Sequence, residues 1–163
     1  MSKTLENLKE AFAGESQANR KYLAFAHKAD QEKMPYAARI FRAAAEAETI
    51  HAHAHLKAMK GIGSTEENLK EALSGEVFEF TDMYPPMIKD AEAEGEKSAL
   101  RSLTLANEAE KVHAEMFQKA LANPGQEASK VYICLVCGHI AEGHTPDQCP
   151  ICGSKSQVYK EID

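Results

Sequence analysis

The sequence predicts an all-α four-helix bundle with a long crossover connection, followed by a small β module of the zinc-ribbon type. Residues 3–122 are rich in Ala, Glu, Lys, Leu and Met, and their apolar side chains recur every three or four residues, as in amphipathic helices. Histidines and carboxylates occupy some positions of the same apolar stripes. All four cysteines fall between Cys134 and Cys152, so packing alone must hold the helices.

The helices are expected at 3–30, 35–60, 76–94 and 96–122. Pro35 suits the first turn of the second helix, and Pro85 should kink the third. Ser64 begins a capping-box pattern that should open a short helix, which Gly75 then breaks. We therefore expect residues 61–75 to form the long crossover between two parallel helices.

The charge pattern argues against nucleic acid and membranes as partners. The chain has 163 residues and a formal net charge of -6, without any basic run. No segment approaches the roughly 20 apolar residues that a membrane helix needs, and the N-terminal residues lack a signal-peptide pattern. We expect a cytoplasmic protein, in which cysteines serve more often as metal ligands than as disulfides.

A Glu-x-x-His motif occurs twice on predicted apolar stripes, as Glu48 with His51 and as Glu110 with His113. Residues three apart on a helix face the same side, so each motif presents one carboxylate and one imidazole together. Buried carboxylates are costly unless a counter-charge accompanies them, and metal ions supply that charge. His55 lies one turn after His51 and is a candidate either for a hydrogen bond to a ligand or for the core.

The remaining carboxylates are Glu15 on the first helix and Glu79 on the third, with Glu76 as the second choice on that helix. One Glu from each of two helices, with a Glu-x-x-His from each of the other two, is the ligand set of ferritin-like dimetal bundles. Two imidazoles among several carboxylates favour iron over zinc, because bridging carboxylates hold two redox metals close together. Manganese fits the same ligand types.

The cysteines form two pairs, Cys134-x-x-Cys137 and Cys149-x-x-Cys152, each followed by glycine. This spacing predicts a tetrahedral four-thiolate site. Spacing alone does not separate a structural zinc from a redox iron, because both metals accept four sulfurs. A dimetal redox centre in the same chain favours iron acting as a one-electron carrier. The expected domains are a bundle at 1–122, a linker at 123–130 and a cysteine module at 131–163.

Together these motifs resemble the rubrerythrin family. The resemblance extends over nearly the whole chain and rests on AFAGESQA, the two Glu-x-x-His motifs, FEFTDMYPP and YICLVCGHIAEGHTPDQCPICG, in that order. It implies a ferritin-like di-iron domain followed by a rubredoxin-like domain with one iron, in which zinc is a substitute. The implied iron ligands in the bundle are Glu15, Glu48, His51, Glu79, Asp82, Glu110 and His113. Glu48 and Glu110 would bridge the two irons.

Asp82 departs from the family pattern, which generally has Glu there. In the family one iron moves between a histidine and a carboxylate when the oxidation state changes, and His51 and Asp82 match these positions. Because Asp is one methylene shorter, it would bind through water or leave His51 ligated in both states. Tyr22 matches a family tyrosine near the di-iron centre and is implied as a hydrogen-bond donor of the catalytic site; ordinary core packing is the alternative.

The resemblance implies a peroxidase that reduces hydrogen peroxide to water in defence against oxidative stress. Electrons would come from NADH through an external donor, such as a rubredoxin or a flavoprotein reductase, and then through the cysteine iron. The short linker 123–130 suggests that this iron does not reach its own bundle, so we expect transfer between subunits of a head-to-tail homodimer. Alternatives are an oxygen reductase, a ferroxidase and a non-catalytic zinc adaptor. The adaptor leaves the carboxylates unexplained.

Overall fold

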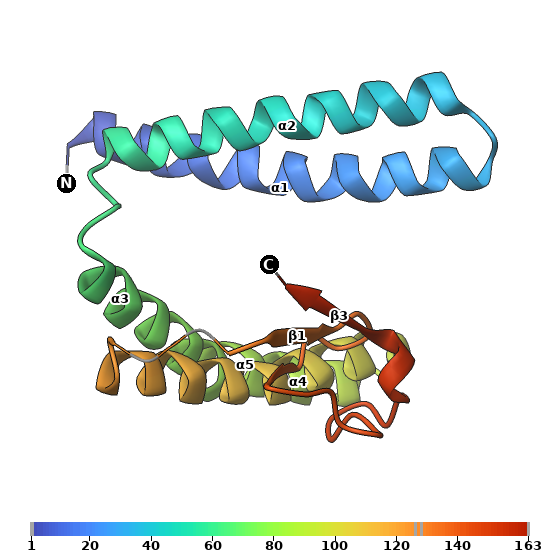
Figure 1. Cartoon of the computed structure of the whole chain (residues 1–163). Helices are drawn as coiled ribbons and strands as arrows, with labels where there is room; N and C mark the ends of the chain where they lie inside the picture. Colours follow the sequence, from blue (N-terminus) through green and yellow to red (C-terminus); the bar gives the residue numbers. More distant parts are fainter. Residues whose placement is uncertain (1, 126, 128, 163) are drawn as a thin grey trace. The chain divides into compact units, whose positions relative to one another are not determined.

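The structure is a computed structural model that describes residues 2–125, 127 and 129–162 (Figure 1). The chain falls into two compact units, Met1–Gly63 and Ser64–Asp163. The first unit is a helical hairpin. The second contains the remaining helices and a three-stranded sheet that carries the cysteines.

The first unit consists of α1 (Lys3–Gln31) and α2 (Pro35–Ala58), which run antiparallel along each other (Figure 1). The Ser2 hydroxyl caps α1 by accepting a hydrogen bond from the Leu5 amide. Small side chains let the two helices approach closely, since the buried apolar residues here are all alanines: Ala26, Ala29, Ala38, Ala45 and Ala52. Both helices lie within two residues of their predicted bounds, which is the usual uncertainty of helix ends.

The second unit begins with α3 (Thr65–Phe78), which Ser64 and Glu67 open through a reciprocal capping box. The capping box was predicted, but the predicted break at Gly75 is wrong, because the helix runs through this glycine. A glycine inside a helix costs about 1 kcal/mol relative to alanine, and the packing of α3 on α5 outweighs that cost. Residues 65–75 are therefore helix rather than crossover.

The connection between α2 and α3 is consequently much shorter than expected. It comprises residues 59–64, between the end of α2 at Ala58 and the start of α3 at Thr65. Six residues span at most ~21 Å when fully extended. The 24 residues of α2 make a helix of roughly 36 Å. The connection is thus too short to run the length of α2.

After α3 the chain forms a π-helical segment, Glu79–Met83, and then α4 (Tyr84–Ala93). Pro85 and Pro86 fall in the first turn of α4, where a missing amide hydrogen does least harm. The predicted irregularity of the third helix is confirmed here, although it takes the form of a π-helical turn just before the prolines. This turn shifts the helical phase at Glu79.

The helix α5 (Lys97–Ala122) packs on both α3 and α4. The sheet that follows has the order β2-β1-β3, with both neighbours antiparallel to β1. Its strands are β1 (Val131–Cys134), β2 (Ile140–Glu142) and β3 (Tyr159–Ile162), and a short 3-10 turn, Ser156–Val158, precedes β3. The predicted fold, a helical domain followed by a small β module with four cysteines, is confirmed.

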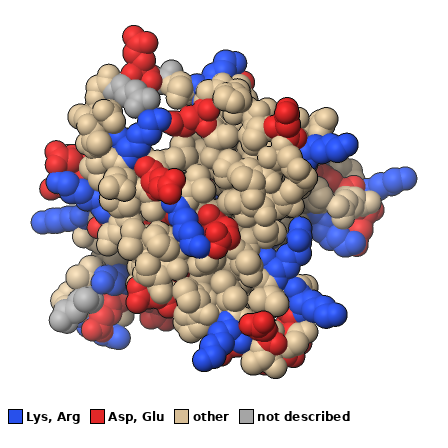
Figure 2. All heavy atoms as spheres, turned by 90° about the horizontal axis from the view of Figure 1, so that it is seen from below, with Lys and Arg blue, Asp and Glu red and all other residues tan. Residues whose placement is uncertain are grey.

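Charged side chains of both signs are interspersed over the face of the molecule shown in Figure 2. No basic patch gathers among the described residues on that face, in keeping with the net charge of -6. Over the described part of the chain, every helix is too short or too polar to span a bilayer.

Candidate metal centres

The first unit brings three of the predicted ligands together, Glu15, Glu48 and His51. Each offers one ligand atom, and these atoms all lie within 4.8 Å of one another. His51 Nδ1 lies 3.0 Å from Glu48 Oε2. The Glu48 side chain is 18% exposed and that of His51 is 55% exposed, so the carboxylate is largely enclosed while the ring is open to solvent.

A buried amide holds the helix pair in register beside this cluster. Asn19, one turn after Glu15, donates from Nδ2 to the Ala45 carbonyl at 2.7 Å and to the Thr49 hydroxyl at 2.8 Å. Thr49 directly follows Glu48, so this contact fixes the α2 turn that carries the carboxylate. The Asn19 side chain thereby positions Glu15 and Glu48 on facing helices.

Tyr22 contributes its ring to an aromatic group in the same hairpin. Its ring centroid lies 6.4 Å from that of Phe25 and 6.3 Å from that of Phe41. Such separations are typical of packed aromatic pairs. The structure therefore shows Tyr22 half-buried among aromatic rings, and its hydrogen bond to the metal site stays a prediction.

The second unit brings together Glu76, Glu110 and His113, whose ligand atoms also lie within 4.8 Å of one another. His113 Nδ1 lies 2.6 Å from Glu110 Oε2 and 3.5 Å from Glu76 Oε2. Burial raises the pKa of Glu76 above its ordinary value, and so do a hydrogen bond that its protonated form can donate to Glu110 and the charge of Glu110. The second-choice carboxylate of the sequence thus belongs to this cluster.

The other predicted residues of this helix lie further along it. Burial and then the charge of Glu76 raise the pKa of Glu79, which indicates that Glu79 lies next to the cluster. Asp82 is exposed and accepts a hydrogen bond from the Thr81 hydroxyl. Neither residue belongs to the group of close ligand atoms, so their ligation stays a prediction.

Tyr84 is a candidate that the sequence reasoning missed. Burial and the charges of Glu110, Glu79 and Glu76 raise the pKa of its phenol, which places it beside the carboxylates. The sequence indicated only a kink at Tyr84-Pro85-Pro86. Its spacing could have indicated it. Tyr84 follows Glu79 by five residues, which is close to one turn of a π-helical segment and puts the two side chains on the same side.

The donor atoms of the two clusters fit iron. Each cluster joins two carboxylates and one imidazole, a ligand set that suits divalent and trivalent iron. In the second cluster, burial and then the neighbouring Glu110 carboxylate raise the pKa of Glu76, so the two close carboxylates disfavour each other's charged form. A bound cation would remove this repulsion.

The four cysteine sulfurs form a compact site in the β module. The Sγ atoms of Cys134 and Cys152 are 3.7 Å apart, and those of Cys137 and Cys149 are 3.6 Å apart. A disulfide would need about 2.05 Å, whereas a tetrahedral metal with sulfur bonds of about 2.3 Å separates its sulfurs by about 3.8 Å. The sulfur positions therefore fit one tetrahedral metal ion.

Both cysteine loops share one backbone design. Gly138 and Gly153 follow the second cysteine of each pair, and they adopt φ values of 81° and 73°. Their amides donate to the carbonyls of Cys134 and Cys149 at 2.9 and 3.0 Å, which closes each loop. A side chain would strain this left-handed conformation, so the turn requires the glycine that follows each cysteine pair.

The surroundings of the Cys149 sulfur favour its thiolate form. Burial raises the pKa of Cys134 and that of Cys137. For Cys149, burial raises the pKa, but hydrogen bonds from the Cys152 amide and the Tyr159 hydroxyl outweigh it and bring the pKa to about 6. Donors already aimed at a sulfur stabilise the charged form that binds metal.

A hydrogen bond joins the cysteine module to the carboxylate cluster within the second unit. His113 Nε2 lies 2.9 Å from the Gly138 carbonyl oxygen, and Gly138 directly follows Cys137. A carbonyl only accepts, so Nε2 carries the hydrogen and Nδ1 remains directed at the carboxylates. The expectation that the linker 123–130 keeps the module away from its own helices is therefore wrong for α5.

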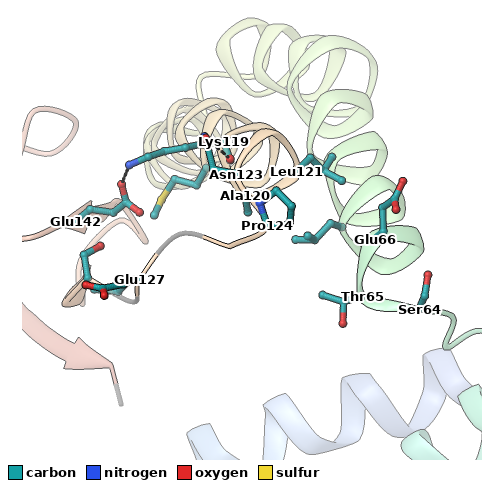
Figure 3. Close-up of a pocket in the computed structure, with 14 residues that line it drawn as sticks. Ser64, Thr65, Glu66, Lys119, Ala120, Leu121, Asn123, Pro124, Glu127 and Glu142 are labelled. Carbon is teal, nitrogen blue, oxygen red and sulfur yellow. Dashed lines mark hydrogen bonds and ion pairs between the residues drawn. The ribbon is translucent and has the colours of Figure 1, made fainter.

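The second unit also has a hollow of about 880 Å³ between the start of α3, the end of α5 and the β module (Figure 3). Lys119 and Glu142 form an ion pair across part of its wall (Figure 3). Its described lining contains neither histidine nor cysteine, and it includes no residue of the metal clusters. This hollow is therefore separate from the candidate chemistry.

Comparisons with known proteins find relatives over most of the chain. The model of the rubrerythrin family matches residues 6–121, and that of the rubrerythrin rubredoxin-like domain matches residues 132–160. Rubrerythrin-2 of Clostridium acetobutylicum is 37% identical, covering 96% of this chain and 95% of its own length. Nigerythrin of Nitratidesulfovibrio vulgaris is 38% identical, covering 91% of this chain and 81% of its own length.

Solved structures give the same result. A partially reduced nigerythrin matches with a TM-score of 0.60 at 34% identity, covering 99% of this chain and 88% of that chain. A fully reduced, all-ferrous nigerythrin matches with the same TM-score and identity. The resemblance that the sequence motifs indicated is confirmed, while the domain bounds at 122 and 131 stay a prediction.

Proposed function

The chain belongs to the rubrerythrin family, with di-iron residues and a rubredoxin-like four-cysteine iron site, and we propose on this basis that it is a peroxidase. The reaction takes hydrogen peroxide, two electrons and two protons to two molecules of water. The electrons enter through the four-cysteine iron from an external donor, such as a rubredoxin or a flavoprotein reductase that oxidises NADH. Defence against peroxide in the cytoplasm is the role this activity would serve.

The proposed ligands come from both clusters. Two carboxylates and an imidazole from each side would together give the family ligand set. These are Glu15, Glu48, His51, Glu76, Glu110 and His113, with Glu79 beside them. Glu76 enters this set because of its place in the cluster, while direct ligation by Asp82 stays a prediction. The four cysteines, Cys134, Cys137, Cys149 and Cys152, would hold the single iron.

The bound iron pair would supply the two electrons that the O–O bond receives. The carboxylates around it would offset the higher charge of the oxidised pair. Tyr84 would hold its proton on the phenol oxygen, because the surrounding carboxylates disfavour a phenolate. The phenol is thus suited to donate a hydrogen bond, or a proton, to a departing oxygen beside Glu110.

The hydrogen bond between His113 and Gly138 is the observation that carries the proposal. It supports electron delivery because it joins a residue adjoining Cys137 to an imidazole of the carboxylate cluster at 2.9 Å. A structural zinc module needs no such link. The same bond fixes the His113 tautomer, since Nε2–H is donated and Nδ1 keeps its lone pair for metal.

We also propose a homodimer, as expected from the family, and the short connection 59–64 suggests its form. A ferritin-like bundle needs one connection that follows the whole length of its helices. Six residues reach at most ~21 Å, which is less than the length of α2. In the proposed dimer, the Glu15 and Glu48 side of one copy completes the Glu110 side of its partner.

The proposal is tested by loading the full chain with iron and following peroxide consumption with a reducing donor. We expect about three irons per chain and turnover that depends on peroxide. A Cys137→Ser chain should keep iron in the bundle but lose donor-driven turnover. Zinc in the bundle positions, or a reduced chain that is indifferent to peroxide, would contradict the proposal.

A further inference from the structure

One imidazole ring connects the backbone of the first cysteine loop to the carboxylate cluster of the second unit. The Gly138 carbonyl accepts a hydrogen bond from His113 Nε2–H at 2.9 Å, and the His113 side chain is only 19% exposed. The opposite ring nitrogen, Nδ1, lies 2.6 Å from Glu110 Oε2. Any change that moves the Gly138 carbonyl is therefore felt by a candidate metal ligand.

Hydrogen bonds to Cys134 fix the position of this carbonyl. The Gly138 amide donates to the Cys134 carbonyl at 2.9 Å, and the Cys134 amide donates to the His139 carbonyl at 2.8 Å. The chain is thus held on both sides of the Gly138 carbonyl by the backbone of one cysteine. A metal ion bound to the sulfurs of Cys134 and Cys137 would close the same loop.

Few contacts other than a bound metal can hold this module together. Its strands have only three or four residues each. Of its described residues, three are buried, and two of these are the cysteines Cys134 and Cys149; the third is His139. Domains below about 40 residues usually need metals or disulfides, and metal binding then supplies folding free energy. Filling the cysteine site should therefore make the loop at Gly138 more rigid.

We propose that a metal ion at the four cysteines strengthens metal binding by the cluster of Glu76, Glu110 and His113, and that the Gly138 carbonyl transmits this effect. Holding His113 Nε2–H at the carbonyl orients the ring and leaves the Nδ1 lone pair for a metal. Loss of such an outer hydrogen bond typically lowers metal affinity about 10- to 100-fold. The inference rests on the metal ligation in the proposed function, but it needs neither peroxide nor electron transfer.

The effect must act in both directions. By thermodynamic linkage, a metal ion in the carboxylate cluster raises the affinity of the cysteine site by the same factor. The physical reason is the charge of the ion. A cation on His113 Nδ1 makes Nε2–H a stronger donor to the Gly138 carbonyl, and this bond stabilises the loop that holds Cys137.

The position of Ala109 offers a way to break the coupling without changing any candidate ligand. A side chain on Gly138 would begin 4.0 Å from Ala109 Cβ, and Ala109 is only 1% exposed. The cysteine loop therefore lies directly against α5 at this alanine. A leucine there would need space that the loop occupies, so Ala109→Leu should separate the Gly138 carbonyl from His113.

The test is the binding of Mn²⁺ to the full chain under reducing conditions, followed by the electron paramagnetic resonance signal of the free ion. Manganese prefers carboxylates and zinc prefers thiolates, so the two ions report on separate sites. The chain that carries one equivalent of Zn²⁺ should bind Mn²⁺ about tenfold more tightly than the metal-free chain. Mn²⁺ should tighten Zn²⁺ binding by the same factor, measured against a competing chelator.

The variants separate a transmitted effect from a general one. In Ala109→Leu the effect of zinc on Mn²⁺ affinity should disappear, whereas the control Ala99→Leu, at an exposed position near the start of α5, should keep it. A zinc effect that persists in Ala109→Leu would overturn the role of Gly138. Equal Mn²⁺ affinities with and without zinc in the parent chain would overturn the coupling, whether or not the variants fold.

Failure of the proposed function would be seen separately. A chain that binds Mn²⁺ and shows the zinc effect but ignores peroxide would support the coupling and contradict the peroxidase. A chain that binds no Mn²⁺ with or without zinc would overturn the ligand assignment and the coupling together.

Discussion

Replacing Glu76 with glutamine should stabilise the metal-free chain while weakening its hold on iron. Burial and Glu110 raise the pKa of Glu76 above the ordinary 4.5. The folded chain therefore binds more protons than the unfolded chain between 4.5 and the raised pKa, so the free energy of unfolding falls as pH rises through this window. Above the raised pKa the loss of stability is fully present. Glutamine removes the charge that causes it.

The size of the effect follows from the geometry of the cluster. The ligand atoms of Glu76 and Glu110 lie within 4.8 Å, where two like charges repel by about 3.5 kcal/mol at an effective dielectric constant of ~20. Water and the neighbouring His113 ring reduce this value. We expect a net gain of about 1 to 2 kcal/mol, or roughly 2 to 8 °C in Tm for a chain of 163 residues.

The assay is thermal unfolding of the reduced, metal-free chain followed by circular dichroism, with Glu71→Gln as a control on the exposed face of α3. Glu76→Gln should unfold at a higher temperature than both the parent chain and the control at pH 7. This advantage should shrink toward pH 4.5, where the parent Glu76 takes up its proton. Equal Tm values for the two variants would refute the repulsion, and unimpaired iron binding by Glu76→Gln would refute its role as a ligand.

Three other predictions follow from the sites. Gly138→Ala should destabilise the cysteine module by about 1 to 2 kcal/mol, because φ is 81° there, and its iron absorption should then be lost at a lower temperature. His113→Ala should slow reoxidation of the cysteine iron by peroxide at least tenfold with its spectrum intact; an unchanged rate in rapid mixing would argue against the Gly138 link. Co-expressing a Glu48→Ala chain with a Glu110→Ala chain should restore activity that each lacks alone, since a mixed dimer would contain one intact centre; inactivity of every mixture would exclude this dimer.

Local patterns were enough to predict much of the molecule. Helix positions follow from side-chain periodicity, and the cysteine site follows from two short loops whose spacing alone fixes four sulfurs. The pairing of Glu48 with His51 is equally local, since residues three apart share a helix face. These features needed no knowledge of how distant segments pack.

Features that depend on packing or helix phase were not predictable in the same way. A glycine weakens an isolated helix, but α3 continues through Gly75 because it packs on α5. The choice between Glu76 and Glu79 depends on a π-helical turn that alters the phase of the helix, and no periodic pattern announces this turn. The bond from His113 to Gly138 joins residues 25 apart in sequence, so only the folded chain reveals it.

The most direct test of the central claim is rapid mixing of the fully reduced, iron-loaded chain with one equivalent of hydrogen peroxide under anaerobic conditions. The account predicts that the iron pair is oxidised first and that the visible band of the cysteine iron then appears as its electron passes to the bundle. A parallel experiment with dissolved oxygen should be slower. A cysteine band that never appears, or one that appears equally fast in a chain lacking the carboxylate clusters, would contradict electron delivery from the module to the iron pair.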